Sequence, residues 1–178
     1  MKEVNKNAQV WVETVIYTLI ALVMIGLVLS FAKPKIEEFQ DKATIEQSIK
    51  MMGQIDSVIR EIDQRGVGNQ RTMQIELKDG SLKINGVNDK LVFEITSRYQ
   101  YSEEDSDYSE GDITINTEKK GELNLVSLTI EYGLRYDLTY QLKDNLKTID
   151  KASVPYDVKI SNNGAGSDGR IKINFEVN

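Results

Sequence analysis

The fold of this chain is decided by one uncharged stretch near its start, TVIYTLIALVMIGLVLSFA (residues 14–32). As a helix rising about 1.5 Å per residue, this stretch would be about 28 Å long, close to the hydrocarbon thickness of a bilayer. A buried core helix, a cleaved secretory signal and a retained membrane helix are the alternatives. Core helices rarely use so long an apolar run, and secretory signals are shorter and followed by a small-x-small cleavage site. The sequence therefore predicts a retained membrane helix.

The composition excludes several classes of functional site. The 178 residues include no cysteine and no histidine, and the net charge is -6. Thiol nucleophiles, disulfides, Cys/His zinc sites and His-based triads are therefore excluded. A nucleic-acid partner is not expected, because phosphate binding needs a basic face. No motif marks a catalytic, metal or cofactor site, so we expect the protein not to be an enzyme.

One carboxylate, Glu13, lies immediately before the uncharged stretch. A charged side chain costs about 2.5–3.5 kcal/mol at the centre of a membrane helix on insertion scales. Glu13 lies near an end, where two interpretations are open. In the first interpretation its side chain reaches water at the membrane surface. In the second it meets a positive partner when helices pack together.

The residues around Glu13 resemble the N-terminus of type IV pilins. In that family a prepilin-type peptidase removes a short basic leader after a small residue, and a glutamate is the fifth residue of the mature chain. A cut between Ala8 and Gln9 would make Glu13 the fifth residue here. Bacterial pilins carry glycine where this chain has Ala8, so the resemblance is closer to archaeal pilins with a class III signal peptide. It covers roughly residues 1–35.

The resemblance implies a structural subunit of a surface filament. Residues 1–8 would be the leader, and residues 9–35 the transmembrane and polymerisation helix. Glu13 would attract the new amine of Gln9 on a neighbouring subunit. The implied partners are a prepilin-type peptidase, membrane lipid before assembly, copies of itself or other pilins, and the pilus assembly machinery. The alternative is a surface binding or adhesion module that keeps its leader and remains anchored outside the cytoplasm.

The sequence of residues 36–66 predicts an amphipathic stem helix. Apolar residues recur there at steps of three and four, on one face of the helix. They are Ile45, Ile49, Met52, Ile55, Ile59 and Ile62. We expect this face to pack on the domain that follows rather than to form a free coiled coil. Pro34 should kink or locally open the helix, and Gly66 and Gly68 should end it.

Residues 70–178 predict a β-rich head, which makes the fold class α+β: a long helix, then an antiparallel β-sandwich or curved sheet. Alternating apolar residues flank Asp79-Gly80, a strong signal for a two-residue hairpin between strands near 72–77 and 82–84. Residues 142–152 predict a loop or helical turn. Further strands are predicted at 91–101, 112–117, 122–132, 134–142, 156–161 and 170–177.

Two loops and a set of tyrosines are further candidates for function. The acidic segment 103–112 matches a calcium loop poorly and predicts a solvated loop, and the glycine-rich stretch 162–169 predicts a flexible connection. A sugar-binding tyrosine face is an alternative to core packing, but one strand face would carry Leu134, Tyr136, Leu138, Tyr140 and Leu142, which favours core. The other tyrosines considered are Tyr99, Tyr101, Tyr132 and Tyr156.

Overall fold

The first element of the computed structural model, which describes residues 6–104 and 106–178, is one long helix, α1 (Lys6–Arg65). The chain divides into two compact units, one ending at Phe39 and the other comprising Gln40–Asn178. The backbone stays helical through Pro34, so the local opening predicted there is not observed. A proline removes only one backbone donor, and long helical segments flank this one. The helix ends as predicted at Gly66, whose φ is +87°.

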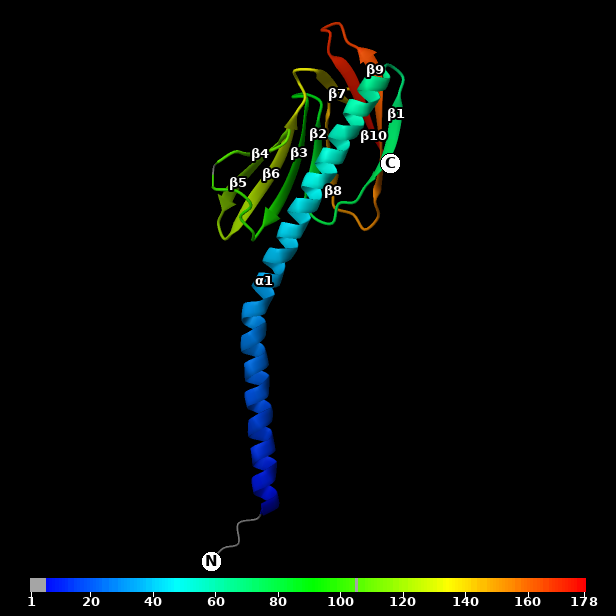
Figure 1. Ribbon diagram of the computed structural model, residues 1–178. Coiled ribbons are helices and arrows are strands. Elements are labelled where there is room, and N and C mark those ends of the chain that lie inside the picture. The colour runs from blue at the N-terminus through cyan, green and yellow to red at the C-terminus, as the bar shows by residue number, and fades with distance from the viewer. Residues whose placement is uncertain (1–5, 105) are drawn as a thin grey trace, which may run out of the picture. The chain divides into compact units, whose positions relative to one another are not determined.

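Two β-sheets form the rest of the second unit (Figure 1). The smaller has the order β1 (Gln70–Ile75), β9 (Tyr156–Ala165), β10 (Ile171–Val177) and β7 (Tyr136–Tyr140). The larger has the order β4 (Tyr108–Glu110), β5 (Ile113–Lys120), β6 (Leu123–Glu131), β3 (Lys90–Ser97), β2 (Ser81–Asn85) and β8 (Leu146–Asp150). The pairs are antiparallel except β10 with β7, which is parallel. A long helix followed by antiparallel-rich sheets confirms the predicted fold class.

The predicted hairpin at Asp79-Gly80 is wrong. β1 pairs with β9 in the smaller sheet, whereas β2 pairs with β3 and β8 in the larger. Asp79-Gly80 therefore belongs to a crossover between sheets. Gly80 has φ +78°, and a Cβ there would lie 2.6 Å from the carbonyl oxygen of Glu94. A glycine is needed for this close approach. The chain does bend at Asp79-Gly80, but the strands on either side of the bend do not pair with each other.

The segment predicted as a loop or helical turn at residues 142–152 contains β8. A tight turn precedes it, in which the amides of Tyr140 and Lys143 each donate to the other residue's carbonyl oxygen. Gln141 and Leu142 occupy the left-handed region, with φ of 51° and 62°. Such turns normally use asparagine or glycine, and neither residue occupies these two positions. The predicted all-buried face also fails at its ends, because Leu134 and Leu142 are exposed.

Three other predicted boundaries need correction. β3 ends at Ser97 rather than at residue 101. The acidic segment contains the short strand β4. The predicted connection at 162–169 is partly strand, since β9 continues to Ala165. Asn162 is buried there, and its side-chain amide donates to the carbonyl oxygen of Ile62 at 3.4 Å, which ties β9 to the end of α1.

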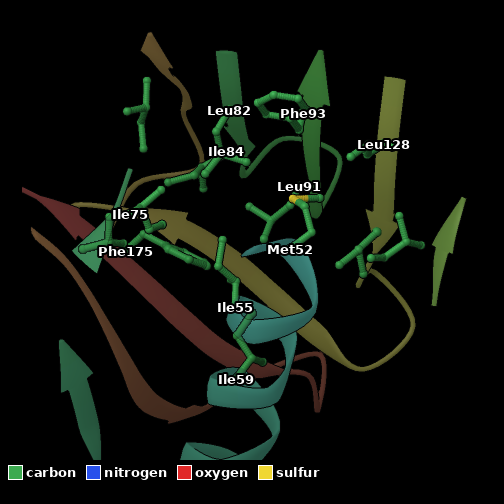
Figure 2. Close-up of a cluster of buried hydrophobic side chains, with 14 of the residues drawn as sticks. Met52, Ile55, Ile59, Ile75, Leu82, Ile84, Leu91, Phe93, Leu128 and Phe175 are labelled. Carbon is green, nitrogen blue, oxygen red and sulfur yellow. The ribbon is translucent and has the colours of Figure 1, made fainter. Parts of the chain in front are cut away.

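The stem half of α1 is part of the head's core, as predicted. Figure 2 shows Met52 beside Leu91 of the larger sheet and Ile55 near Phe175 of the smaller one, with Ile59 one turn further along the stem. All six stripe residues are buried: Ile45, Ile49, Met52, Ile55, Ile59 and Ile62. The larger sheet contributes Leu82, Ile84, Leu91, Phe93 and Leu128 to the same core. Full burial of such a side chain contributes about 1.5–3 kcal/mol, so the stem stabilises the head directly.

Candidate functional site

The N-terminal part of α1 has an unusual surface. It is the one helix in the described part of the chain that is long and apolar enough to cross a membrane. Its large apolar side chains between Val10 and Phe31 are 39–77% exposed. The head, by contrast, buries most of its large apolar side chains. An apolar surface of this kind, which the chain itself does not cover, is consistent with membrane anchoring.

The hydroxyl groups of this stretch bond to the helix itself. Thr14 Oγ1 donates to the carbonyl oxygen of Val10 at 2.9 Å, and Thr18 Oγ1 donates to that of Thr14 at 2.8 Å. Ser30 Oγ donates to the carbonyl oxygen of Leu27 at 2.7 Å. Polar groups in lipid must find partners within the protein. These three hydroxyls do so without water, which suits an apolar surrounding.

The residues predicted to direct cleavage and assembly all belong to α1. Ala8 and Gln9 lie in its first turns, and Glu13 follows Gln9 by four residues, or about 6 Å of helical rise. Residues 1–5 of the predicted leader lie outside the described residues. The Glu13 side chain is exposed, and Trp11 and Tyr17 lie exposed on either side of it in sequence. Aromatic residues of this kind are typical of the membrane surface.

The other end of the apolar stretch carries ion pairs along the helix. Lys33 Nζ lies 3.9 Å from Glu37 Oε1, and Lys35 Nζ lies 2.6 Å from Glu38 Oε2. The two lysine side chains are 79% and 70% exposed. Because charged side chains are costly in lipid, this run of charges marks the end of the segment that lipid could cover. The two ends of the apolar stretch therefore carry different chemistry: a carboxylate at the first, and paired charges at the second.

The tyrosines considered as a binding face are largely part of the packing. Tyr132 and Tyr136 are buried, with ring centroids 5.8 Å apart in an edge-to-face arrangement. Their hydroxyls donate to Asp56 Oδ1 at 3.1 Å and to Asp63 Oδ2 at 3.0 Å. Burial, with these carboxylates nearby, raises the pKa of both phenols. Both tyrosines therefore stay neutral, and their hydrogen bonds link the strands of the head to the stem helix.

The sequence did not reveal the charge cluster around these tyrosines. Arg60 contacts Asp56 Oδ2 and Asp112 Oδ2, both at 2.7 Å, and Arg135 contacts Asp63 Oδ2 at 2.6 Å. The groups line a cavity of about 240 Å³. Each of these charges has an opposite partner, and Arg60 is shared by Asp56 and Asp112. The cluster therefore fastens the stem to the strands of the head. The seven-residue spacing of the two helix aspartates was the available signal.

A second unpredicted cluster joins the two sheets. Asp89, in the turn between β2 and β3, accepts the amide of Leu138 in β7 at 2.9 Å and pairs with Arg170. Arg170 also contacts Asp168 Oδ2 at 2.6 Å, and this hydrogen bond lowers the pKa of Asp168. The Asp89 carboxylate thus bridges the larger sheet to the smaller one.

Asp137 lies on β7 close to that bridge. Its pKa is raised by burial and by the negative charges of Asp144 and Asp89. Lys172 Nζ lies 3.8 Å away and offsets part of this effect. Across residues 6–104 and 106–178, no three acidic, histidine or cysteine side chains are grouped so as to hold a metal ion.

The acidic segment is exposed where the structure describes it. Asp107 accepts the Asn116 side-chain amide at 3.0 Å, and Asp112 is held by Arg60. These contacts fix the segment to neighbouring elements and do not gather its carboxylates around a common point.

Comparison with protein-family models, with curated proteins and with solved structures finds no match to this chain.

Proposed function

We propose that this protein is a structural subunit of a type IV pilus-like surface filament. The observation that carries the proposal is Glu13, placed four residues after Gln9 at the start of an apolar helix that the chain leaves exposed. A prepilin-type peptidase would cut between Ala8 and Gln9. The apolar part of α1 would then leave lipid and pack against copies of itself or other pilins, with the head outside the cytoplasm.

The role of Glu13 follows from electrostatics. Cleavage gives Gln9 a positively charged amine. In a dry helix bundle an unpaired carboxylate is costly, whereas a carboxylate and an amine about 4 Å apart attract by about 4 kcal/mol at an effective dielectric constant of about 20. Desolvation offsets much of this gain, so the pair selects the register between helices more than it adds stability. The protein needs no enzymatic activity or cofactor for this role.

The N-terminus of the membrane-associated protein tests the proposal. Intact mass and terminal sequencing should show Gln9 as the first residue. Glu13→Ala should be cleaved and inserted normally but fail to assemble, while Glu122→Ala, which removes an exposed carboxylate of the head, should assemble. A retained leader would instead favour the anchored binding or adhesion module, and normal filaments of Glu13→Ala would remove the proposed role of the carboxylate.

A further inference from the structure

Two large apolar side chains of α1 lie beyond the stretch that lipid would cover. Ile36 and Phe39 follow Lys33 and Lys35, about 6 Å and 10 Å of helical rise past Ala32. Ile36 is 54% exposed and Phe39 is 72% exposed. The stem residues that follow bury their apolar face, so these two exposed side chains require a different explanation.

Ile36 and Phe39 continue a regular seam that begins inside the apolar stretch. Residues alternating at steps of three and four form the contact line between packed helices. The seam consists of Leu22, Ile25, Leu29, Ala32, Ile36, Phe39 and Ala43. Because this spacing is kept without a break past Lys33 and Lys35, the element that packs on the apolar stretch should also cover Ile36 and Phe39. That element must be another long apolar helix.

The charges beside the seam indicate which helix that is. Along α1, Lys33 pairs with Glu37 and Lys42 pairs with Glu46. A second α1 lying parallel and displaced by four residues would place Glu37 level with Lys33, and Glu46 level with Lys42. A second α1 with no displacement would place each charged residue level with the same residue of the other copy, so that like charges would face each other. The four-residue displacement is thus complementary at these two pairs and also sets Glu38 level with Lys42, while Glu37 and Asp41 form one like-charged pair. It equals the spacing of Gln9 and Glu13.

We propose that Ile36, Phe39 and Ala43 pack against α1 of a second copy of this chain, displaced by about four residues. This contact would lie outside the bilayer, and it rests on the proposed filament function. In that arrangement Ala43 of one copy is level with Phe39 of the other. The apolar pair would act with Glu13 to set the register, one at each end of the apolar stretch.

The absence of cysteine from the chain allows a clean test by labelling. Phe39→Cys and the milder Ala43→Cys are each placed in the full chain and treated with a membrane-impermeant maleimide. Three forms are compared: filaments, membranes of the same variant carrying Glu13→Ala, and detergent-dispersed protein. We expect labelling several-fold slower in filaments than in the other two forms. Val87→Cys, at a 67% exposed site in the head, is the control and should react equally in all three.

Each outcome decides the inference. Equal labelling in filaments and detergent would overturn it while leaving the filament function intact. Slow labelling already in the Glu13→Ala membranes would show that lipid headgroups cover the site. If the unmodified chain forms no filament, the filament function itself fails; if only the cysteine variants fail to assemble, oxidation of membranes holding both variants decides the contact. Mixed 39–43 disulfides should then exceed like pairs, and their absence would overturn the proposed packing.

Discussion

Ile59→Ala measures how much the head depends on the stem. Ile59 is 0% exposed and belongs to the core cluster that the stem and both sheets form. Truncating a buried isoleucine to alanine removes its transfer free energy and leaves a cavity, at a cost of about 2–5 kcal/mol. A site enclosed by a helix and two sheets has little freedom to collapse, so we expect about 3 kcal/mol. For a domain of this size that corresponds to a fall in Tm of about 6–12 °C.

The assay is thermal unfolding of the full chain in detergent micelles, followed by near-ultraviolet circular dichroism. Buried Tyr132 and Tyr136 make that signal a measure of head packing. Ile59→Val should cost about 0.5–1.5 kcal/mol, and Lys50→Ala, at an exposed position on the same helix, should cost no more than about 0.5 kcal/mol. If Ile59→Ala unfolds at the same temperature as Lys50→Ala, the stem is not part of the cooperative core.

Three further substitutions test individual contacts in the same unfolding assay. Tyr132→Phe should cost about 1–3 kcal/mol, because it removes a hydrogen bond to the Asp56 carboxylate. Gly80→Ala should cost clearly more than Gly111→Ala: both glycines have positive φ, but a Cβ at Gly111 meets nothing within 4 Å. Since the folded-state pKa of Asp137 is raised above 3.8, ionisation lowers stability as pH rises through that region. Asp137→Asn should therefore become more stable relative to the wild type as pH increases toward neutrality, and a constant difference across pH would contradict this.

The stem could be predicted in detail because its signal is local. An apolar face repeated at steps of three and four needs only the helical period to interpret, and every residue assigned to it is buried. The end of the helix at Gly66 follows from the same kind of local rule, since a glycine tolerates the left-handed conformation that terminates a helix. Both features depend on residues within a few positions of one another.

The sheets were less predictable because strand partners are distant in sequence. Alternation identified β1 and β2 as strands but could not show that β1 pairs with β9, about ninety positions further on. The turn at Gln141 and Leu142 lacks the residues that usually favour its conformation, and it is held instead by Asn174, which accepts the Leu142 amide at 2.7 Å. A contact supplied by another strand overrides the local preference there.

The candidate functional residues likewise include some that local sequence indicates and some that it does not. Glu13 and its spacing from Gln9 could be read from the sequence because the resemblance is carried by adjacent residues. The hydrogen bond from Tyr132 to Asp56 spans 76 positions, and no local pattern marks it. A buried hydroxyl that already donates to a stem carboxylate is not available to a sugar.

The two halves of α1 follow different physical requirements, a separation that the proposed assembly would use. From Ile45 onward the apolar face of the helix is buried in the core of the head, so the side chains that hold the head together are separate from those of the apolar half. Before Lys33 the helix bonds its own hydroxyls and leaves its apolar side chains uncovered, so it can exchange lipid for protein contacts. Lipid and a packed helix are similarly apolar, and packing and polar pairing must then drive association. In the proposed filament those terms come from the seam through Phe39 and from Glu13, so weakening either one should impair assembly without unfolding the head.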